Sequence, residues 1–378
     1  MTVTTRGGEK AAVAASEAGT GDKRKLDTSG SPPAPKARKK EDEEQRGGLG
    51  NEQTSRDDRP VKDEERQSDK NEQEEPLSKS VRRAAAGESA VEPHARVGSM
   101  PSNILEKGII YFFFRGRVNV DEPQGVGDIA RSYIVLRPVD KDAKLGRGPI
   151  GDAGNSRLCA IPKKTLPQSG RDRWIAFVEK AGTSFDTLKE TFLTSSDYAT
   201  KTSGTSHRPA ATPVGEGVYA ITSTGRESHL AYMLTIPEKL GEVQREIGLK
   251  EKGSFIISTR NPEYPAPKTA QLPGAPEYPK GVIDEFRSLR WLPTKPKHLD
   301  FAKAQFLLIG ESSGIRKAVE PTDEDKKDPA KDEPVDELEN LEDEDKQRMA
   351  HLSNDDSEAI FADLETRAKD YPKLQTTF

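Results

Sequence analysis

The chain has very little cysteine, few apolar residues and no long hydrophobic run. Cys159 is the only cysteine among 378 residues, which excludes a disulfide framework and a cysteine-based zinc site. No apolar run approaches the roughly 18 residues of a membrane span, and the N-terminal residues lack the apolar core of a secretory signal. These absences predict a soluble intracellular protein with no membrane partner. The short apolar stretch around Cys159 predicts a buried, inert thiol.

Hydrophobic residues make up 32% of the chain and charged residues 33%, which favours one compact domain with long solvated segments. The net charge of −5 is unevenly spread. Residues 1–100 carry a net charge of −1, residues 101–317 carry +8, and residues 318–378 carry −12. A basic middle and an acidic tail predict a polyanionic partner for the middle, or a tail that screens it.

Residues 1–100 contain no aromatic residue and are rich in Gly, Ser, Pro and charged residues, so we expect a disordered N-terminal arm. Within it, two basic residues precede a ten-residue spacer and a second basic cluster. This spacing is typical of a bipartite nuclear import signal, although a chance basic patch is the simpler alternative. The residues of the signal are Arg24, Lys25, Lys36, Arg38, Lys39 and Lys40.

The ordered core is expected from about residue 101 to 311, around the most hydrophobic run, Gly108 to Val118. Its Ile, Tyr and Phe residues favour a core strand. Strands are predicted at 108–117, 130–137, 156–161, 172–180, 217–223, 228–236, 253–259 and 304–310. Helices are predicted at 184–193, where Ser184 can act as N-cap, and at 240–247 and 281–287.

The eight strands fall into two sets of four with weak internal similarity. Gly108 matches Gly217, Tyr133 matches Tyr232 in the second pair of strands, and Trp174 begins a stretch that matches one near residue 306. We therefore predict a mainly β (α+β) fold, in which a duplicated four-strand unit forms a pseudo-symmetric antiparallel barrel or packed sheets. Chance alignment of two β-rich stretches remains the alternative.

Cationic and hydroxyl side chains suggest where a ligand would bind. A Ser/Thr/Pro-rich loop at 194–214 and a turn at 222–226 contain several of them, and others flank the first predicted hairpin. Such groups hold phosphate or sulfate oxygens, although exposed turns also carry them. The candidates are Arg115, Arg117, Arg131, Lys201, His207, Arg208, Thr224 and Arg226.

Patterns typical of enzymes are missing. The chain has no phosphate-binding loop, dinucleotide-binding glycine pattern, metalloprotease helix or nucleophile elbow. Its five histidines lack ligand spacing, so we expect no metal site, no cofactor and no catalytic residue.

The tail from residue 318 contains two predicted helices. One covers 335–352, and the other, 357–371, has an apolar face that we expect to dock on the core or on a partner.

Three segments, Glu106–Val118, Ala130–Pro138 and Thr222–Leu234, resemble a group of filamentous-fungal proteins labelled "BTB domain transcription factor". The resemblance covers roughly residues 100–311. It implies a nuclear regulator that associates through a protein-interaction domain, and it brings no catalytic residues.

The leading hypothesis is a non-enzymatic nuclear protein, transcription- or chromatin-associated, that acts through its basic core and acidic tail. Its partners would be the nuclear import receptor and nucleic acid or chromatin proteins, while its oligomeric state is open. The alternative is an intracellular enzyme or sensor of a small phosphorylated ligand, bound between the 194–214 loop and the 222–226 turn.

Overall fold

The computed structural model of the protein describes residues 90–148, 150–200, 204–266, 272–323 and 325–355. The import signal and the predicted helix 357–371 lie outside these residues. The strands are β1 (Val91–Glu92), β2 (Ile104–Gly116), β3 (Ile129–Val139), β4 (Lys144–Leu145), β5 (Ser156–Ile161), β6 (Arg173–Thr183), β7 (Ser196–Thr200), β8 (Gly204–Arg208), β9 (Ala211–Ser223), β10 (Ser228–Ile236), β11 (Lys252–Arg260), β12 (Trp291–Pro293) and β13 (Gln305–Gly310). The α-helices are α1 (Phe185–Leu188), α2 (Glu242–Ile247), α3 (Lys280–Phe286) and α4 (Pro334–Asp355), and the shorter helical segments are η1 (Val126–Asp128), η2 (Lys189–Leu193), η3 (Pro296–Leu299) and η4 (Asp325–Lys327).

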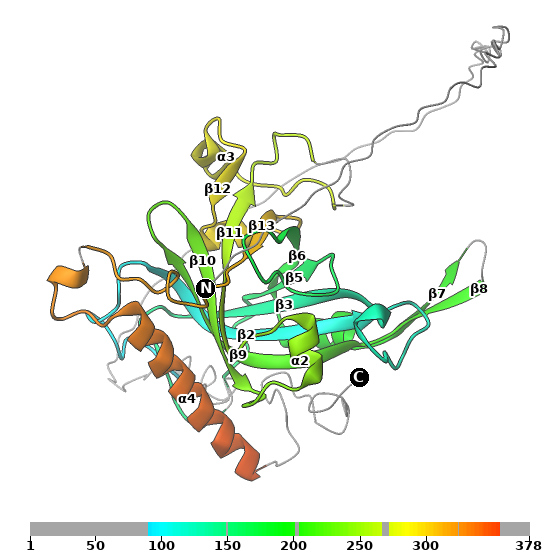
Figure 1. Ribbon diagram of the computed structural model, residues 1–378, viewed down its shortest axis with the longest axis horizontal. Helices are drawn as coiled ribbons and strands as arrows, with labels where there is room; N and C mark the ends of the chain where they lie inside the picture. Colours follow the sequence, from blue (N-terminus) through cyan, green and yellow to red (C-terminus); the bar gives the residue numbers. More distant parts are fainter. Residues whose placement is uncertain (1–89, 149, 201–203, 267–271, 324, 356–378) are drawn as a thin grey trace, which may run out of the picture. The chain divides into compact units, whose positions relative to one another are not determined.

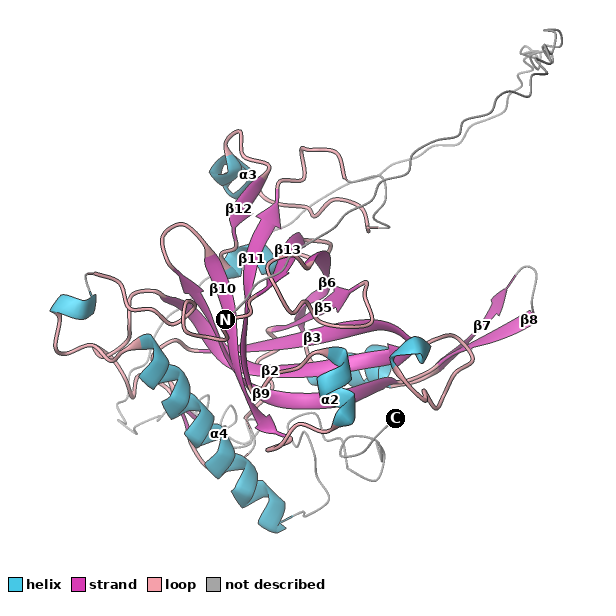
Figure 2. Cartoon of the chain, viewed as in Figure 1, coloured by secondary structure: helices cyan, strands magenta, loops and turns pink. Residues whose placement is uncertain are grey.

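Eight antiparallel strands close into a barrel (Figures 1 and 2). Their order is β10-β9-β2-β3-β5-β6-β13-β11, and the pairing of β10 with β11 completes the ring. β12 extends the sheet where β11 runs beyond β10. Each of the eight predicted strands corresponds to one barrel strand, so the mainly β prediction is confirmed.

β2 shows why the most hydrophobic run of the chain belongs to this fold. Its side chains alternate between two buried clusters. Ile110 and Phe112 lie in a cluster to which all eight barrel strands contribute, which identifies the barrel interior. Ile109 and Tyr111 lie in the cluster on the outer face. A strand buried on both faces needs apolar residues at successive positions, and this explains the unbroken run.

The barrel interior is filled by side chains. The rings of Phe112 and Tyr232 approach to 5.0 Å between centroids, and Tyr232 stacks on Phe255 at 5.6 Å. β2 and β10 are not neighbours in the sheet, so the first contact crosses the interior. Cys159 also points inward and is 1% exposed, as predicted for an inert thiol.

The strand order is the one expected from a duplicated four-strand unit. β2-β3-β5-β6 and β9-β10-β11-β13 are two meanders, joined through β2–β9 and β6–β13. A two-fold axis perpendicular to the barrel axis exchanges them and keeps every neighbour antiparallel. Gly108 and Gly217 occupy equivalent positions, because a side-chain carbon at either would overlap the backbone carbonyl of the following strand, at Arg137 or Met233.

In β3 and β10, the second strands of the two units, the structurally equivalent positions differ from those matched in the sequence. Counting from the two equivalent glycines along the ladders, Pro138 corresponds to Leu234, three residues before Pro237. An odd shift exchanges the two faces of a strand. Tyr133 accordingly lies on the outer face and Tyr232 in the interior, so the two tyrosines are not counterparts.

The outer face of the barrel is covered by segments from both sides of the predicted core. α1 and η2 follow β6, and the Ser184 hydroxyl caps α1 by accepting the N–H of Thr187 at 3.2 Å, as predicted. α4 packs Leu338 and Leu341 against the outer face of β9 and β10 (Figure 1). β1 pairs with β4. The folded unit therefore includes segments on both sides of the ordered core that was expected at about 101–311.

Candidate functional site

The ends of β2 and β3 place two arginines side by side on the outer face. Arg115 is paired with Arg131 across the ladder, next to Tyr133. Arg115 is buried, and its guanidinium donates hydrogen bonds to the carbonyl oxygens of Phe192 (2.6 Å) and Pro209 (2.7 Å). Arg131 is only half-buried. Arg115 thus stabilises the fold, whereas Arg131 reaches the surface.

The predicted loop 194–214 instead contains a β-hairpin, β7–β8, which extends away from the barrel (Figure 1). Ser196 is paired with Arg208, and Tyr198 with Ser206. In a two-stranded ribbon, the side chains of a cross-strand pair lie on the same face as those of the next pair but one. The side chains of these two pairs therefore lie together. The Tyr198 residue is 45% exposed, which is unusual for an aromatic residue in this chain.

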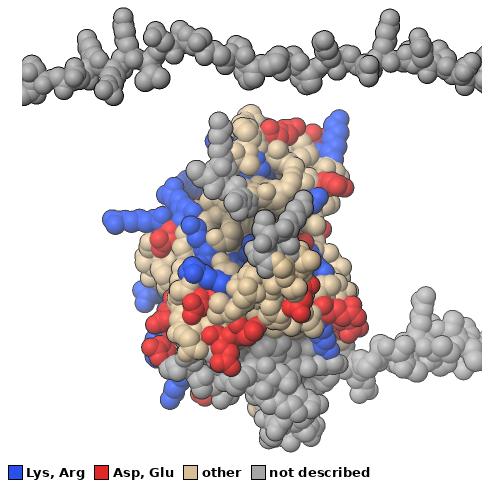
Figure 3. Space-filling view, turned by 90° about the vertical axis from the view of Figure 1, so that its right-hand side faces the viewer, with Lys and Arg blue, Asp and Glu red and all other residues tan. Residues whose placement is uncertain are grey.

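A groove of about 670 Å³ separates the hairpin from the ends of β2 and β3. Figure 3 shows the side of the molecule that faces right in Figure 1, where basic side chains gather above a band of acidic ones. The groove is lined by Arg115, Gly116, Val118, Ala130, Arg131, Tyr133, Phe177, Glu179, Ser196, Tyr198 and Arg208. Three arginines and one acidic residue therefore face the same space.

The positive charge of the groove is not neutralised. Within the described residues, no carboxylate lies within ion-pair distance of Arg131 or Arg208. Burial lowers the pKa of Arg115, and repulsion from Arg208 lowers it further. Glu179 acts in the opposite direction on Arg115. With no ion-pair partner among the described residues, Arg131 and Arg208 can bind an anion from outside.

His207 holds the hairpin in place rather than lining the groove. Its Nδ1 lies 2.5 Å from a carboxylate oxygen of Asp197, and its Nε2 lies 3.0 Å from Asp121. Its backbone N–H donates to the side-chain oxygen of Asn119 at 2.7 Å. The hydrogen bond to Asp197 raises the pKa of His207, and the charge of Asp121 adds to this. The imidazolium therefore links the hairpin to the loop that follows β2.

The remaining predicted ligand residues are not brought together with this groove. Arg117 is exposed beside it, and Lys201 lies outside the described residues. Thr224 and Arg226 are exposed in the β9–β10 turn. That turn and Arg208 lie at opposite ends of β9, whose 13 residues span roughly 40 Å at about 3.3 Å each. A ligand bound between loop and turn, as in the alternative hypothesis, is not supported by this separation.

Sequence reasoning missed Tyr198, Ser196 and Glu179. The signal available for the first two was alternation within 196–200, where serine, tyrosine and threonine occupy every second position. Glu179 lies in a predicted strand, but its place near β2 depends on how β2, β3, β5 and β6 pair in sequence.

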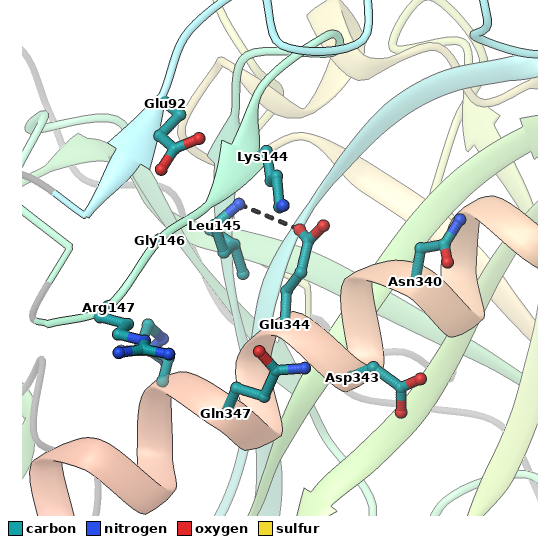
Figure 4. Close-up of a pocket in the computed structure, with 10 residues that line it drawn as sticks. Glu92, Lys144, Leu145, Gly146, Arg147, Asn340, Asp343, Glu344 and Gln347 are labelled. Atoms are coloured by element: carbon teal, nitrogen blue, oxygen red, sulfur yellow. Dashed lines mark hydrogen bonds between the residues drawn. The ribbon is translucent and has the colours of Figure 1, made fainter.

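A second pocket, of about 600 Å³, lies between α4 and β4 (Figure 4). Its charges are of both signs, from Lys144 and Arg147 on one side and Asp343 and Glu344 on the other. The Glu344 carboxylate accepts the backbone N–H of Leu145 at 3.0 Å, and burial raises its pKa. This acid is engaged in attaching α4, so the pocket is a weaker candidate for a ligand site.

The acidic side chains of α4 are largely used to hold the helix on the barrel. Glu337 is 1% exposed and accepts from Lys107 at 2.7 Å and from Arg96 at 2.6 Å. Further along, Arg348 bridges Asp345 of its own helix and Glu216 of β9. These carboxylates neutralise the basic side chains that are buried beside them. The described part of the acidic segment is therefore a structural element.

Comparison with protein-family models, curated proteins and solved structures found no match for the chain. Among the described residues, no helix has the length and apolar character needed to cross a membrane. The same residues contain no group of three or more His, Cys, Asp or Glu side chains placed to hold a metal ion.

Proposed function

We propose that the protein is a non-enzymatic nuclear binding protein, associated with transcription or chromatin, whose groove beside β7–β8 binds nucleic acid. The observation that carries the proposal is a pair of arginines, Arg131 and Arg208, that line the groove and have no carboxylate within ion-pair distance among the described residues. Two buried basic side chains elsewhere are held by carboxylates: Arg157 by Glu106, and Lys107 by Glu337. Free guanidinium groups at an open groove are suited to phosphate oxygens.

Two sequence features support a nuclear location for this activity. The basic clusters at 24–25 and 36–40 have the spacing of a bipartite import signal. The segments that resemble fungal transcription-associated proteins include β2, which carries Arg115 into the groove.

Charge reversal in the full chain tests the groove. Arg131→Glu with Arg208→Glu should weaken binding to a fluorescent oligonucleotide, and should reduce the slope of log K against log salt by about 2, one for each lost phosphate contact. The matched control is Arg171→Glu with Arg226→Glu, two exposed arginines outside the groove that impose the same change in net charge. Equal losses in both variants, or no binding by the unchanged chain, would reject the proposal.

The import signal is tested by localisation. Replacing Lys36, Arg38, Lys39 and Lys40 with alanine in a fluorescent fusion of the full chain should abolish nuclear accumulation. Nuclear accumulation that persists in this variant would show that these four residues are not part of an import signal.

A further inference from the structure

We propose that the groove binds single-stranded nucleic acid, with an unpaired base stacked on Tyr198 and the flanking phosphates on Arg131 and Arg208. The inference rests on the proposed function and specifies the form of nucleic acid. It starts from a side chain that the packing of the barrel does not use. Tyr198 is 45% exposed, whereas the tyrosines at 111, 133, 219 and 232 are each at most 1% exposed.

Tyr198 is presented to the groove by a defined register. Its cross-strand partner is Ser206, and the neighbouring pair on the same face is Ser196 with Arg208. Successive residues of a strand point to opposite faces, so Asp197 and His207 lie on the other side of the ribbon. The ring of Tyr198, the hydroxyl of Ser196 and the guanidinium of Arg208 thus share the face that lines the groove, with Ser206 buried beside the ring.

The hairpin is anchored at its base, which keeps this face in position. The His207 imidazole bridges Asp197 of β7 and Asp121 of the loop after β2. The backbone N–H of Asn119 donates to the His207 carbonyl at 2.8 Å. Because these contacts join the base of the hairpin to the loop after β2, we expect Tyr198 to keep its position and to lose little freedom on binding.

A base is the ligand group that this combination fits best. An aromatic ring beside arginines provides a stacking surface together with phosphate contacts, the arrangement used for single strands. In a duplex, the faces of the bases are covered by their neighbours, so a tyrosine ring at the surface can stack only on an unpaired base. An acidic peptide would satisfy the arginines but would leave the exposed ring without a role.

The test measures affinities of the full chain for a fluorescent mixed-sequence 15-mer of single-stranded DNA and for the matching duplex. Tyr198→Leu should weaken single-strand binding roughly 5- to 150-fold, the effect of losing one stacked base. Tyr198→Phe keeps the ring and should bind as the unchanged chain does. Because Tyr198 is exposed, both variants should melt at the temperature of the unchanged chain, which is the control for folding.

The outcomes separate this inference from the proposed function. Should Tyr198→Leu bind normally while the double reversal at Arg131 and Arg208 fails to bind, nucleic-acid binding would stand and the stacking inference would be overturned. Tighter binding of the duplex than of the single strand would also overturn it. If Tyr198→Leu and the double reversal both bind as tightly as the unchanged chain, the stacking inference and the proposed function are both overturned.

Discussion

Replacing Arg157 with methionine should destabilise the protein strongly, because it leaves a charge unpaired inside the barrel. Arg157 of β5 is 4% exposed and holds the Glu106 carboxylate with two hydrogen bonds, of 2.6 and 2.9 Å. Tyr219 of β9 donates a third, at 2.7 Å. The cluster links three strands through an otherwise apolar interior.

The expected cost follows from what remains after the change. Without Arg157, the Glu106 carboxylate keeps only the Tyr219 hydroxyl, and removing one partner of a buried ion pair costs about 3–5 kcal/mol. In a folded unit of this size, each kcal/mol lowers Tm by about 2–4 °C, so Tm should fall by roughly 10 °C. Tyr219→Phe removes one hydrogen bond to a charged group and should cost about 1.5–3 kcal/mol.

Urea unfolding of the full chain, followed by fluorescence of Trp174 and Trp291, measures these costs. The double variant Glu106→Gln with Arg157→Met leaves no buried charge unpaired, because Asp300, the other carboxylate that contacts Arg157, is exposed to solvent. It should regain a substantial part of the lost stability. A loss below about 1 kcal/mol for Arg157→Met would refute the reasoning, and so would a double variant whose loss equals the sum of its single losses.

Three further predictions concern other parts of the barrel. Burial raises the pKa of Cys159 to about 12, so a thiol reagent at pH 8 should label it only after unfolding; labelling of the native protein within minutes would contradict its interior position. Gly108→Ala forces a carbon against the carbonyl of β3 and should cost at least about 1–3 kcal/mol, whereas Gly170→Ala adds a carbon in open space, and equal urea midpoints would disprove the close approach. The hydrogen bond to Asp197 raises the pKa of His207, so the contribution of this contact to stability is complete below the unfolded value of about 6.5 and is lost as pH rises through the folded value. An NMR titration that places the His207 pKa at or below about 6.5 would contradict the bridge.

The strands were predictable because their apolar residues are continuous or alternate over four or more residues. β2 and β10 are buried on both faces, and their long apolar runs favoured strands clearly. The relative register of the two halves was not predictable, because Tyr133 and Tyr232 lie in similar short sequences. Only the hydrogen-bonded ladders reveal the odd shift that turns them to opposite faces.

The docking of α4 on the barrel escaped prediction because polar residues of this helix are buried against it. The helix at 335–352 was expected, but its docking positions include Glu337 and Asp345, which sequence periodicity assigns to solvent. Their burial becomes favourable only beside Lys107 and Arg348. Such pairing depends on the folded barrel.

Some of the residues that line the groove were predictable from the sequence. Arg115, Arg131 and Arg208 were candidates on chemical grounds, and they do line one space. The turn at 222–226 was included because the duplication suggested related strand ends. In the barrel, the two-fold relation places equivalent ends of β2 and β9 apart, since the paired strands run in opposite directions.

Photocrosslinking of the full chain to a single-stranded oligonucleotide that contains 5-iodouracil tests the central claim most directly. The account predicts that mass spectrometry finds the crosslinked base on the peptide that contains Tyr198, and that charge reversal at Arg131 and Arg208 abolishes the crosslink. Crosslinks confined to the arm at residues 1–89, or to the β9–β10 turn, with none on β7–β8, would contradict it.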